Sequence, residues 1–233
     1  MSSTIGNQAD WTARARRIAK IVIPNRVIAE ILRYRKYKRE ERPLYVKLRL
    51  LNGLGLKRER SRRVPPTARS FLFLCFGNIM RSPMCEALMK RAVSAARINV
   101  HVTSAGLNAT PGRPAHPWSL AAARDFGIDL SQHRARLVSQ RMLDDADAIF
   151  VMDYQNQVEL LSRFPAVADK VFMLSAYAGD NYKSIEIRDP FFGDEQETRN
   201  CYNILETCIR NLTATLVACP TIRNRARVTA QAQ

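Results

Sequence analysis

The feature that most constrains the fold is a repeated alternation of short apolar runs with amphipathic segments after residue 70. The apolar runs are 70–76, 98–106, 147–153 and 170–176, and helical patterns fall at 82–96, 116–126, 154–163 and 194–218. Each run has the length of a strand and is apolar enough to be buried on both faces. The alternation predicts a Rossmann-like α/β fold of three layers, in which helices flank a four-stranded parallel sheet.

Cys75 stands at the end of the first predicted strand, which is where ligands bind in open parallel sheets. The loop after it leads into a predicted helix, so backbone N–H groups and the helix N-terminus can face one anion. Gly77 allows a tight turn, Asn78 tolerates left-handed angles, and the planar guanidinium of Arg81 can grip two phosphate oxygens. We therefore expect a phosphate-binding loop that comprises Phe76, Gly77, Asn78, Ile79, Met80, Arg81 and Ser82.

The same groups favour the thiolate form of Cys75 over the thiol. A thiolate beneath a bound phosphoryl group is placed for in-line attack on phosphorus, so Cys75 is the expected nucleophile. Cys85 and Arg91 repeat the Cys-x5-Arg spacing, but they lie inside a predicted helix without glycine, where two ends cannot wrap around one centre. Cys201, Cys208 and Cys219 are expected to be buried structural thiols.

The stretch CFGNIMRSPMCEAL, residues 75–88, resembles the signature of the low-molecular-weight protein tyrosine phosphatases. Further motifs follow in family order: TSAGL at 103–107, GRPAHP at 112–117, HRARL at 133–137, VMD at 151–153 and RDPFFGD at 188–194. The resemblance covers residues 70–215. It implies the phosphotyrosine phosphatase I type of fold and hydrolysis of phosphotyrosine in proteins, and it makes a tyrosine kinase one candidate partner.

The resemblance also implies roles for individual residues. Cys75 would form a cysteinyl-phosphate, Arg81 would clamp the phosphate, and Asp189 would protonate the leaving phenol and then activate water. The supporting residues that it implies are Asn78, Ser82 and His133 for the phosphate-binding loop, Asp153 for loop structure, and Phe191 and Phe192 for an aromatic wall. It implies no cofactor and no metal.

Three alternative functions stay open. Arsenate reductases of this fold relay oxidation through two further cysteines, and residues 144–155 offer none. Arginine-phosphate phosphatases of this fold carry Thr where this chain has Ile79, which favours phosphotyrosine as the substrate. A non-catalytic phosphate-binding module tethered by the N-terminal extension is the third alternative.

One departure from the family pattern concerns oxidation. Many relatives have a second cysteine where this chain has Met80, and that cysteine can pair with the nucleophile. We therefore expect peroxide to inactivate the enzyme with poor recovery by thiols.

Residues 1–70 hold 19 of the 37 Lys and Arg residues but 5 of the 21 Asp and Glu, so most of the +16 net charge lies there. We expect a basic, helical or partly disordered extension over 1–69, a phosphatase domain over 70–218 and a tail over 219–233. Within the extension, 57–69 has the charge and the Pro-Pro pair of a linker.

The extension also has amphipathic character. Its apolar stripe comprises Ile18, Val22, Val27, Ile28, Ile31 and Leu32, and Pro24 is expected to divide it between two helices. Such an element suits an anionic membrane surface or an acidic partner. No nucleic-acid recognition motif appears. Because no apolar run approaches the ~18 residues of a membrane span, we expect a cytoplasmic protein that can lie peripherally on a membrane.

Overall fold

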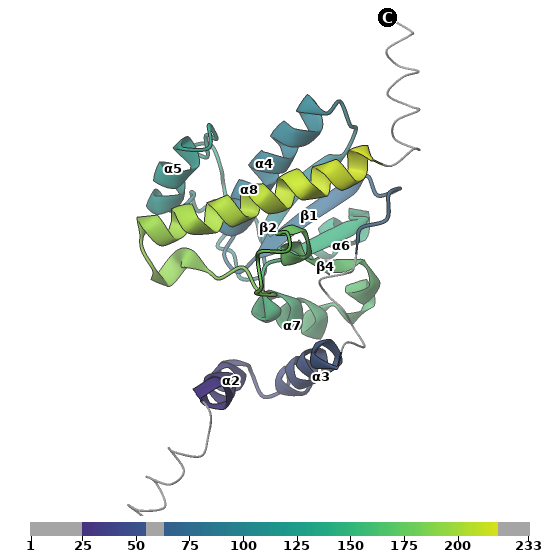
Figure 1. Cartoon of the computed structure of the whole chain (residues 1–233), viewed down its shortest axis with the longest axis vertical. Helices are drawn as coiled ribbons and strands as arrows, with labels where there is room; N and C mark the ends of the chain where they lie inside the picture. The colour runs from purple at the N-terminus through teal and green to yellow at the C-terminus, as the bar shows by residue number, and fades with distance from the viewer. Residues whose placement is uncertain (1–24, 55–62, 219–233) are drawn as a thin grey trace, which may run out of the picture. The chain divides into compact units, whose positions relative to one another are not determined.

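The computed structural model describes residues 25–54 and 63–218 of the chain (Figure 1). They form two compact units that divide after Lys47. The predicted stripe residues Ile18 and Val22, the break at Pro24, the tail over 219–233 and Cys219 lie outside the described residues.

The larger unit contains a four-stranded parallel sheet, as predicted. Its strands are β1 (Ser70–Cys75), β2 (His101–Gly106), β3 (Ala148–Val151) and β4 (Val171–Met173), in the order β2-β1-β3-β4. Leu74 on the central strand β1 pairs with Ala105 on one side and with Val151 on the other. All strands run parallel, so their C-terminal ends meet at one edge of the sheet.

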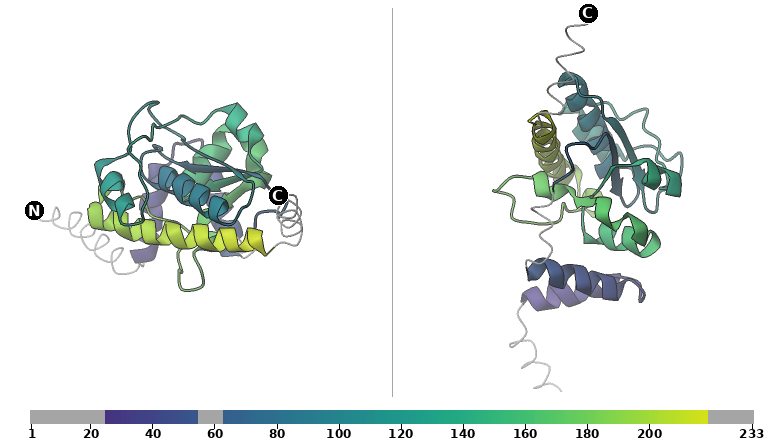
Figure 2. Two further views of the ribbon diagram at one scale, coloured as in Figure 1. Left: turned by 90° about the horizontal axis from the view of Figure 1, so that it is seen from above. Right: turned by 90° about the vertical axis from the view of Figure 1, so that its right-hand side faces the viewer.

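Helices cover both faces of this sheet. The helices are α4 (Arg81–Ala95), α5 (Pro117–Arg124), α6 (Gln140–Asp145), α7 (Tyr154–Arg163) and α8 (Glu195–Val217). Figures 1 and 2 show α4, α5 and α8 on one face and α6 and α7 on the other. The predicted three-layer α/β fold is therefore confirmed. The short helix α6 was not predicted.

Strand β2 begins at residue 101 rather than at the predicted 98, because residues just before it form the turn that ends α4. Arg97 adopts a left-handed φ of 54°. The N–H of Ile98 then reaches back 2.9 Å to the carbonyl of Val93. This turn satisfies the last carbonyls of the helix and delays the strand.

The core between the sheet and α4 and α8 is aromatic. The rings of Phe73 and Phe150 stack with centroids 5.0 Å apart, and Phe71 meets Phe150 edge-on at 5.6 Å. The predicted structural thiols Cys201 and Cys208 are buried in this core, and so is Cys85.

Residues 63–69, which we expected to belong to a linker, instead pack on the larger unit. Val64 and Ala68 are buried in its core, and the N–H of Val64 donates to the hydroxyl of Tyr177 at 2.9 Å. The N–H of Ala68 bonds the carbonyl of Pro65 at 3.0 Å, which closes a turn. The Pro-Pro pair thus shapes a turn whose apolar flanks fold inward, so the prediction of a linker is wrong for these seven residues.

The smaller unit is helical. It holds α2 (Asn25–Lys36) and the first half of α3 (Arg42–Gly53). Tyr37 and Tyr45 stack with ring centroids 4.3 Å apart, and the hydroxyl of Tyr45 donates to Glu30 at 2.5 Å. The predicted helix after Pro24 is confirmed by α2, whereas α3 was not predicted. Among the described residues no helix has the length and apolar character that crossing a membrane requires.

Candidate active site

For the loop after β1 the sequence predicts a tight turn at Gly77 and tolerance of left-handed angles at Asn78. Asn78 takes the left-handed conformation, with φ 52°. Gly77 does not, and a Cβ placed on it would lie 3.5 Å from Ile79, which is ordinary contact. Neither the conformation of Gly77 nor the space around it therefore requires glycine at this position. A glycine on the neighbouring strand is the one that the loop requires.

That glycine is Gly106, at the end of β2. Cys75 pairs with Gly106 across the two strands, and the loop that follows Cys75 folds over the glycine. A Cβ on Gly106 would lie 2.8 Å from each of three backbone atoms, the carbonyl oxygen of Phe76, the carbonyl carbon of Gly77 and the nitrogen of Asn78. A residue with a Cβ at this position would push the loop away from β2, so the position requires glycine.

Asn78 ties the loop together through its fully buried side chain. Its Nδ2 donates to Ser82 Oγ and to Ser104 Oγ, both at 2.9 Å, and its Oδ1 accepts from the N–H of Arg136 at 2.8 Å. The ring of His133 lies with Nε2 2.7 Å from the carbonyl oxygen of Asn78. The expected supporting residues of the loop are thus brought together around one asparagine.

Sequence reasoning missed the outer part of this network. Ser104 Oγ donates to Glu86 Oε2 at 2.6 Å, and Arg136 Nη2 donates to the same oxygen at 2.8 Å. Burial would raise the pKa of Glu86, but the bonds from Lys90 and Ser104 and the charge of Arg136 lower it. The signal available was the TSAGL motif, which contains Ser104 but says nothing of its partners.

The sulfur of Cys75 lies at the base of the loop. Its Sγ is 3.0 Å from Ser82 Oγ, at the start of α4. When the sulfur is a thiolate, the hydroxyl is the donor, which stabilises the negative charge.

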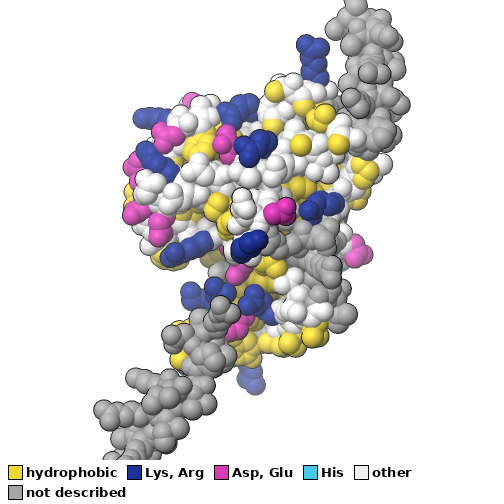
Figure 3. Space-filling model, in the orientation of Figure 1, with side chains coloured by type: hydrophobic (Ala, Val, Ile, Leu, Met, Phe, Trp, Pro, Cys, Tyr) yellow, Lys and Arg dark blue, Asp and Glu magenta, His cyan; other side chains and the backbone are white. Residues whose placement is uncertain are grey.

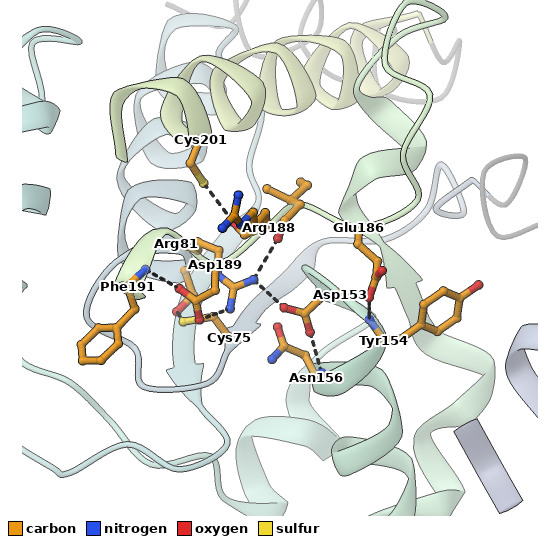
Figure 4. A network of polar contacts seen from close by, with 12 residues as sticks. Cys75, Arg81, Asp153, Tyr154, Asn156, Glu186, Arg188, Asp189, Phe191 and Cys201 are labelled. Atoms are coloured by element: carbon orange, nitrogen blue, oxygen red, sulfur yellow. Dashed lines mark hydrogen bonds and ion pairs between the residues drawn. The ribbon is translucent and has the colours of Figure 1, made fainter. Parts of the chain in front are cut away.

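The Arg81 guanidinium is buried beside the sulfur and held by two carboxylates (Figure 4). Nη1 donates to Asp153 at 2.6 Å and to the carbonyl of Ile187 at 2.9 Å, and Nη2 donates to Asp189 at 2.5 Å. Burial alone would lower the pKa of Arg81, but the charges of Asp153, Asp189 and Cys75 raise it above its ordinary value. Arg81 is therefore a fixed cation at the base of the site.

The two carboxylates differ in position. Asp153, after β3, caps α7 by accepting from the N–H of Asn156 at 2.7 Å, and its side chain is 14% exposed. Asp189 is 33% exposed and caps a 3-10 turn by accepting from the N–H of Phe191 at 3.2 Å. Asp153 thus fixes Arg81 from within, whereas Asp189 meets Arg81 from the side open to solvent.

Aromatic rings stand beside Asp189. Phe191 is 37% exposed and meets the ring of His116 at 5.7 Å, and His116 in turn meets Trp118 at 4.8 Å. Phe192 contacts Phe191 edge-on but is 92% exposed. Phe191 therefore belongs to a wall that includes two rings the sequence reasoning did not select, while Phe192 extends into solvent.

In the described parts of the chain, no three His, Cys, Asp or Glu side chains are grouped so that they could hold a metal ion. The groups that converge are a thiol, a hydroxyl, a buried guanidinium and a partly exposed carboxylate. Such a set can hold an oxyanion, attack its central atom and move one proton.

Comparisons with known proteins agree with this geometry. The family model for low molecular weight phosphotyrosine protein phosphatase matches residues 70–219. The probable low molecular weight protein-tyrosine-phosphatase EpsP of Ralstonia nicotianae is 37% identical over 123 residues, which cover 53% of this chain and 79% of that protein. The protein-arginine-phosphatase of Bacillus subtilis is 33% identical over 141 residues, which cover 60% of this chain and 92% of that protein.

Solved structures give the same result. The YwlE arginine phosphatase from Geobacillus stearothermophilus aligns with a TM-score of 0.57 at 30% identity, over 64% of this chain and 92% of its own. The tyrosine phosphatase AmsI of Erwinia amylovora aligns with a TM-score of 0.58 at 28% identity, over 64% of this chain and 94% of its own. The chain belongs to the low molecular weight phosphotyrosine protein phosphatase family.

Proposed function

We propose that the chain hydrolyses phosphotyrosine in proteins through a cysteinyl-phosphate on Cys75. The observation that carries the proposal is the placement of a buried Arg81 between two carboxylates, beside the Cys75 sulfur. This arrangement supplies a nucleophile, an anion clamp and a proton donor within one site.

Several hydrogen-bond donors of Arg81 and of the loop after Cys75 have no acceptor within the described residues. Three N–H groups of Arg81 are engaged by Asp153, Ile187 and Asp189, which leaves Nε–H and one Nη2–H without an acceptor among the described residues. The backbone N–H groups of 76–80 also donate to no acceptor in the described parts of the chain. These donors are available to the three oxygens of a phosphoryl group, and charge on those oxygens is what the transition state must stabilise.

The first chemical step transfers the phosphoryl group to sulfur. The Cys75 thiolate attacks phosphorus, the S–P bond forms and the bond from phosphorus to the tyrosyl oxygen breaks. Asp189 gives its proton to that oxygen, so the phenol leaves uncharged. In the second step water attacks phosphorus, the Asp189 carboxylate takes the proton of the water, and the S–P bond breaks to return the thiolate.

The pair between Arg81 and Asp189 suggests how Asp189 obtains its proton. A bound phosphate dianion that accepts from the two remaining N–H groups of Arg81 would lie close to the Asp189 carboxylate on Nη2. A carboxylate that faces a dianion at short range is stabilised by protonation, because a like charge disfavours the ionised form. Substrate binding would therefore convert Asp189 from an ion-pair partner into an acid.

Phosphoarginine is the second candidate substrate, because the relatives include an arginine phosphatase. Ile79 favours phosphotyrosine, since the resemblance places Thr at this point in the arginine phosphatases. Ile79 is buried with Met80, Ala109 and Ala135, and Trp118 packs against them. The Ile79 side chain thus places an apolar group in this buried cluster where Thr would place a hydroxyl.

The substrate assignment is tested with two peptides of one sequence, one carrying phosphotyrosine and one carrying phosphoarginine. We expect a higher kcat/KM for phosphotyrosine, and Ile79→Thr should shift the ratio toward phosphoarginine. A wild-type preference for phosphoarginine would contradict the proposal while leaving the phosphatase chemistry intact. A pull-down with Cys75→Ser, which cannot complete the first step, would then identify the phosphoprotein substrate, and a tyrosine kinase is one candidate.

A further inference from the structure

The α2–α3 segment, residues 25–54, carries large apolar side chains that are exposed to solvent. On α2 the exposed apolar residues are Ile28, Ile31 and Leu32, and along α3 and its last turn they are Val46, Leu50 and Leu54. Spacings of three and four residues place each set on one face of its helix. Leu50 is 58% exposed and Leu54 is 70% exposed, which is far from the burial expected of a core leucine.

These stripes are not the faces that hold the two helices together. That contact is made by the stacked rings of Tyr37 and Tyr45 and by the bond from Tyr45 to Glu30. Arg42 adds a bond from its Nε to the carbonyl of Tyr37 at 3.2 Å. The exposed apolar residues therefore take no part in these contacts between α2 and α3.

The same segment carries strong positive charge. Its exposed cations are Arg33, Arg35, Lys36, Lys38, Arg39 and Lys47. Of its three carboxylates, Glu30 accepts from Tyr45, and Glu41 is buried and accepts from the N–H of Lys38 at 3.0 Å. Glu40 alone remains exposed among the described acidic residues of this segment.

Apolar and basic side chains lie next to one another on the surface of this segment (Figure 3). This combination is suited to the interface of an anionic bilayer, where apolar side chains enter the acyl boundary and Lys and Arg meet lipid phosphates. An acidic protein groove would match the charge, but a bilayer matches both the charge and apolar stripes that lie open along two helices. We infer that the α2–α3 segment binds peripherally to membranes that contain anionic lipid.

This binding is independent of the phosphatase chemistry, because its residues lie outside the catalytic site. It would hold the phosphatase domain near phosphoproteins at a membrane surface and raise their effective concentration.

The test is flotation of the full chain with vesicles, either of phosphatidylcholine alone or with about a third phosphatidylglycerol. We expect the chain to float with the anionic vesicles at low salt, and far less with phosphatidylcholine. At about 0.5 M salt the binding should weaken more than tenfold, because charge contributes most of the attraction.

Two double variants separate the contribution of charge to membrane binding from the contribution of apolar contact. Lys36→Gln with Lys38→Gln should weaken binding about fivefold for each charge removed. Ile31→Asn with Leu50→Asn should weaken it at least tenfold, because both side chains lose their apolar contact with the bilayer. Val217→Asn is the matched control, since Val217 is 44% exposed on α8, outside the α2–α3 segment, and it should bind as the wild type does. Unchanged aryl phosphatase activity shows that the phosphatase domain of each variant is folded, and unchanged helical circular dichroism shows that α2 and α3 are still formed.

Several outcomes would overturn the inference. Absence of flotation with anionic vesicles at low salt is one, and loss of binding in the Val217 control to the same degree as in the helix variants is another. Self-association of the wild type that the helix variants abolish, without any lipid binding, would assign the stripes to a second copy instead. None of these results bears on whether Cys75 carries a phosphoryl group, so the two proposals fail separately.

Discussion

Replacing Gly106 with alanine should displace the phosphate-binding loop although Gly106 is not part of the loop. The new Cβ would lie 2.8 Å from three backbone atoms of residues 76–78. Backbone cannot rotate away as a flexible side chain can, so the loop must lift or the strand must shift. Overpacking of this kind costs about 1–3 kcal/mol, and we expect a value near the top of that range. For a domain of this size about 3 kcal/mol lowers Tm by roughly 6–12 °C.

Activity should fall further than stability suggests. A displacement of about 1 Å in groups that position a substrate lowers the rate roughly 100-fold, so kcat/KM on an aryl phosphate should fall by about that factor. The matched comparison is Gly77→Ala, whose Cβ would make ordinary contact 3.5 Å from Ile79. That variant should lose less than about 1 kcal/mol, because alanine also restricts the unfolded chain. Thermal melts give Tm and steady-state kinetics give kcat/KM for both variants, and each value is compared with that of the wild type. Greater damage from Gly77→Ala than from Gly106→Ala would show that the close approach at Gly106 does not set the position of the loop.

Three further predictions concern Arg81, His133 and the thiols. Asp153→Asn keeps the cap of α7 but removes the negative charge that pairs with the buried Arg81. We expect the free energy of unfolding, measured in urea, to fall by about 3 kcal/mol and kcat/KM to fall at least tenfold. Wild-type values of both would contradict this role of Asp153. Burial lowers the pKa of His133 in the folded state, so the folded domain binds fewer protons than the unfolded chain, and stability should fall as pH drops below about 6.5. His133→Asn should reduce that fall between pH 7.5 and pH 5, and an unchanged profile would exclude His133 as the cause. Peroxide should inactivate the enzyme with poor recovery by thiols. Burial raises the pKa of Cys85, and it raises the pKa of Cys201 and Cys208 to about 12. These cysteines therefore provide little thiolate that could form a disulfide with an oxidised Cys75. Recovery through a Cys75–Cys85 disulfide seen by mass spectrometry would count against it.

Local patterns predicted the larger part of the fold. The apolar runs gave all four strands, and the phosphate-binding loop was found because it joins a strand to a helix start within a few residues. Asn78 was expected to tolerate a left-handed conformation, and it adopts one. These features depend on neighbours in the chain, which a single sequence displays.

The features that were missed depend on residues far apart in the sequence. Gly106 is required because a distant loop folds over it, and nothing in its own surroundings indicates this. Asp153 was expected to serve loop structure, but it also holds Arg81 through an ion pair that spans 72 residues. The Pro-Pro pair at 65–66 has the composition of a linker, although its apolar neighbours are buried in the core. Composition reports local preference, and tertiary packing decides the outcome in such places.

A cysteinyl-phosphate on Cys75 can be trapped by acid quench of the wild-type chain during turnover of an aryl phosphate, followed by mass spectrometry of its peptides. We expect one phosphoryl group on the peptide that contains Cys75, and none in Cys75→Ser. Asp189→Asn should slow turnover of phenyl phosphate far more than that of an ester with an acidic phenol, since only the poor leaving group needs the proton. Turnover that persists in Cys75→Ser, or a phosphoryl group that is never found on Cys75, would exclude Cys75 as the nucleophile.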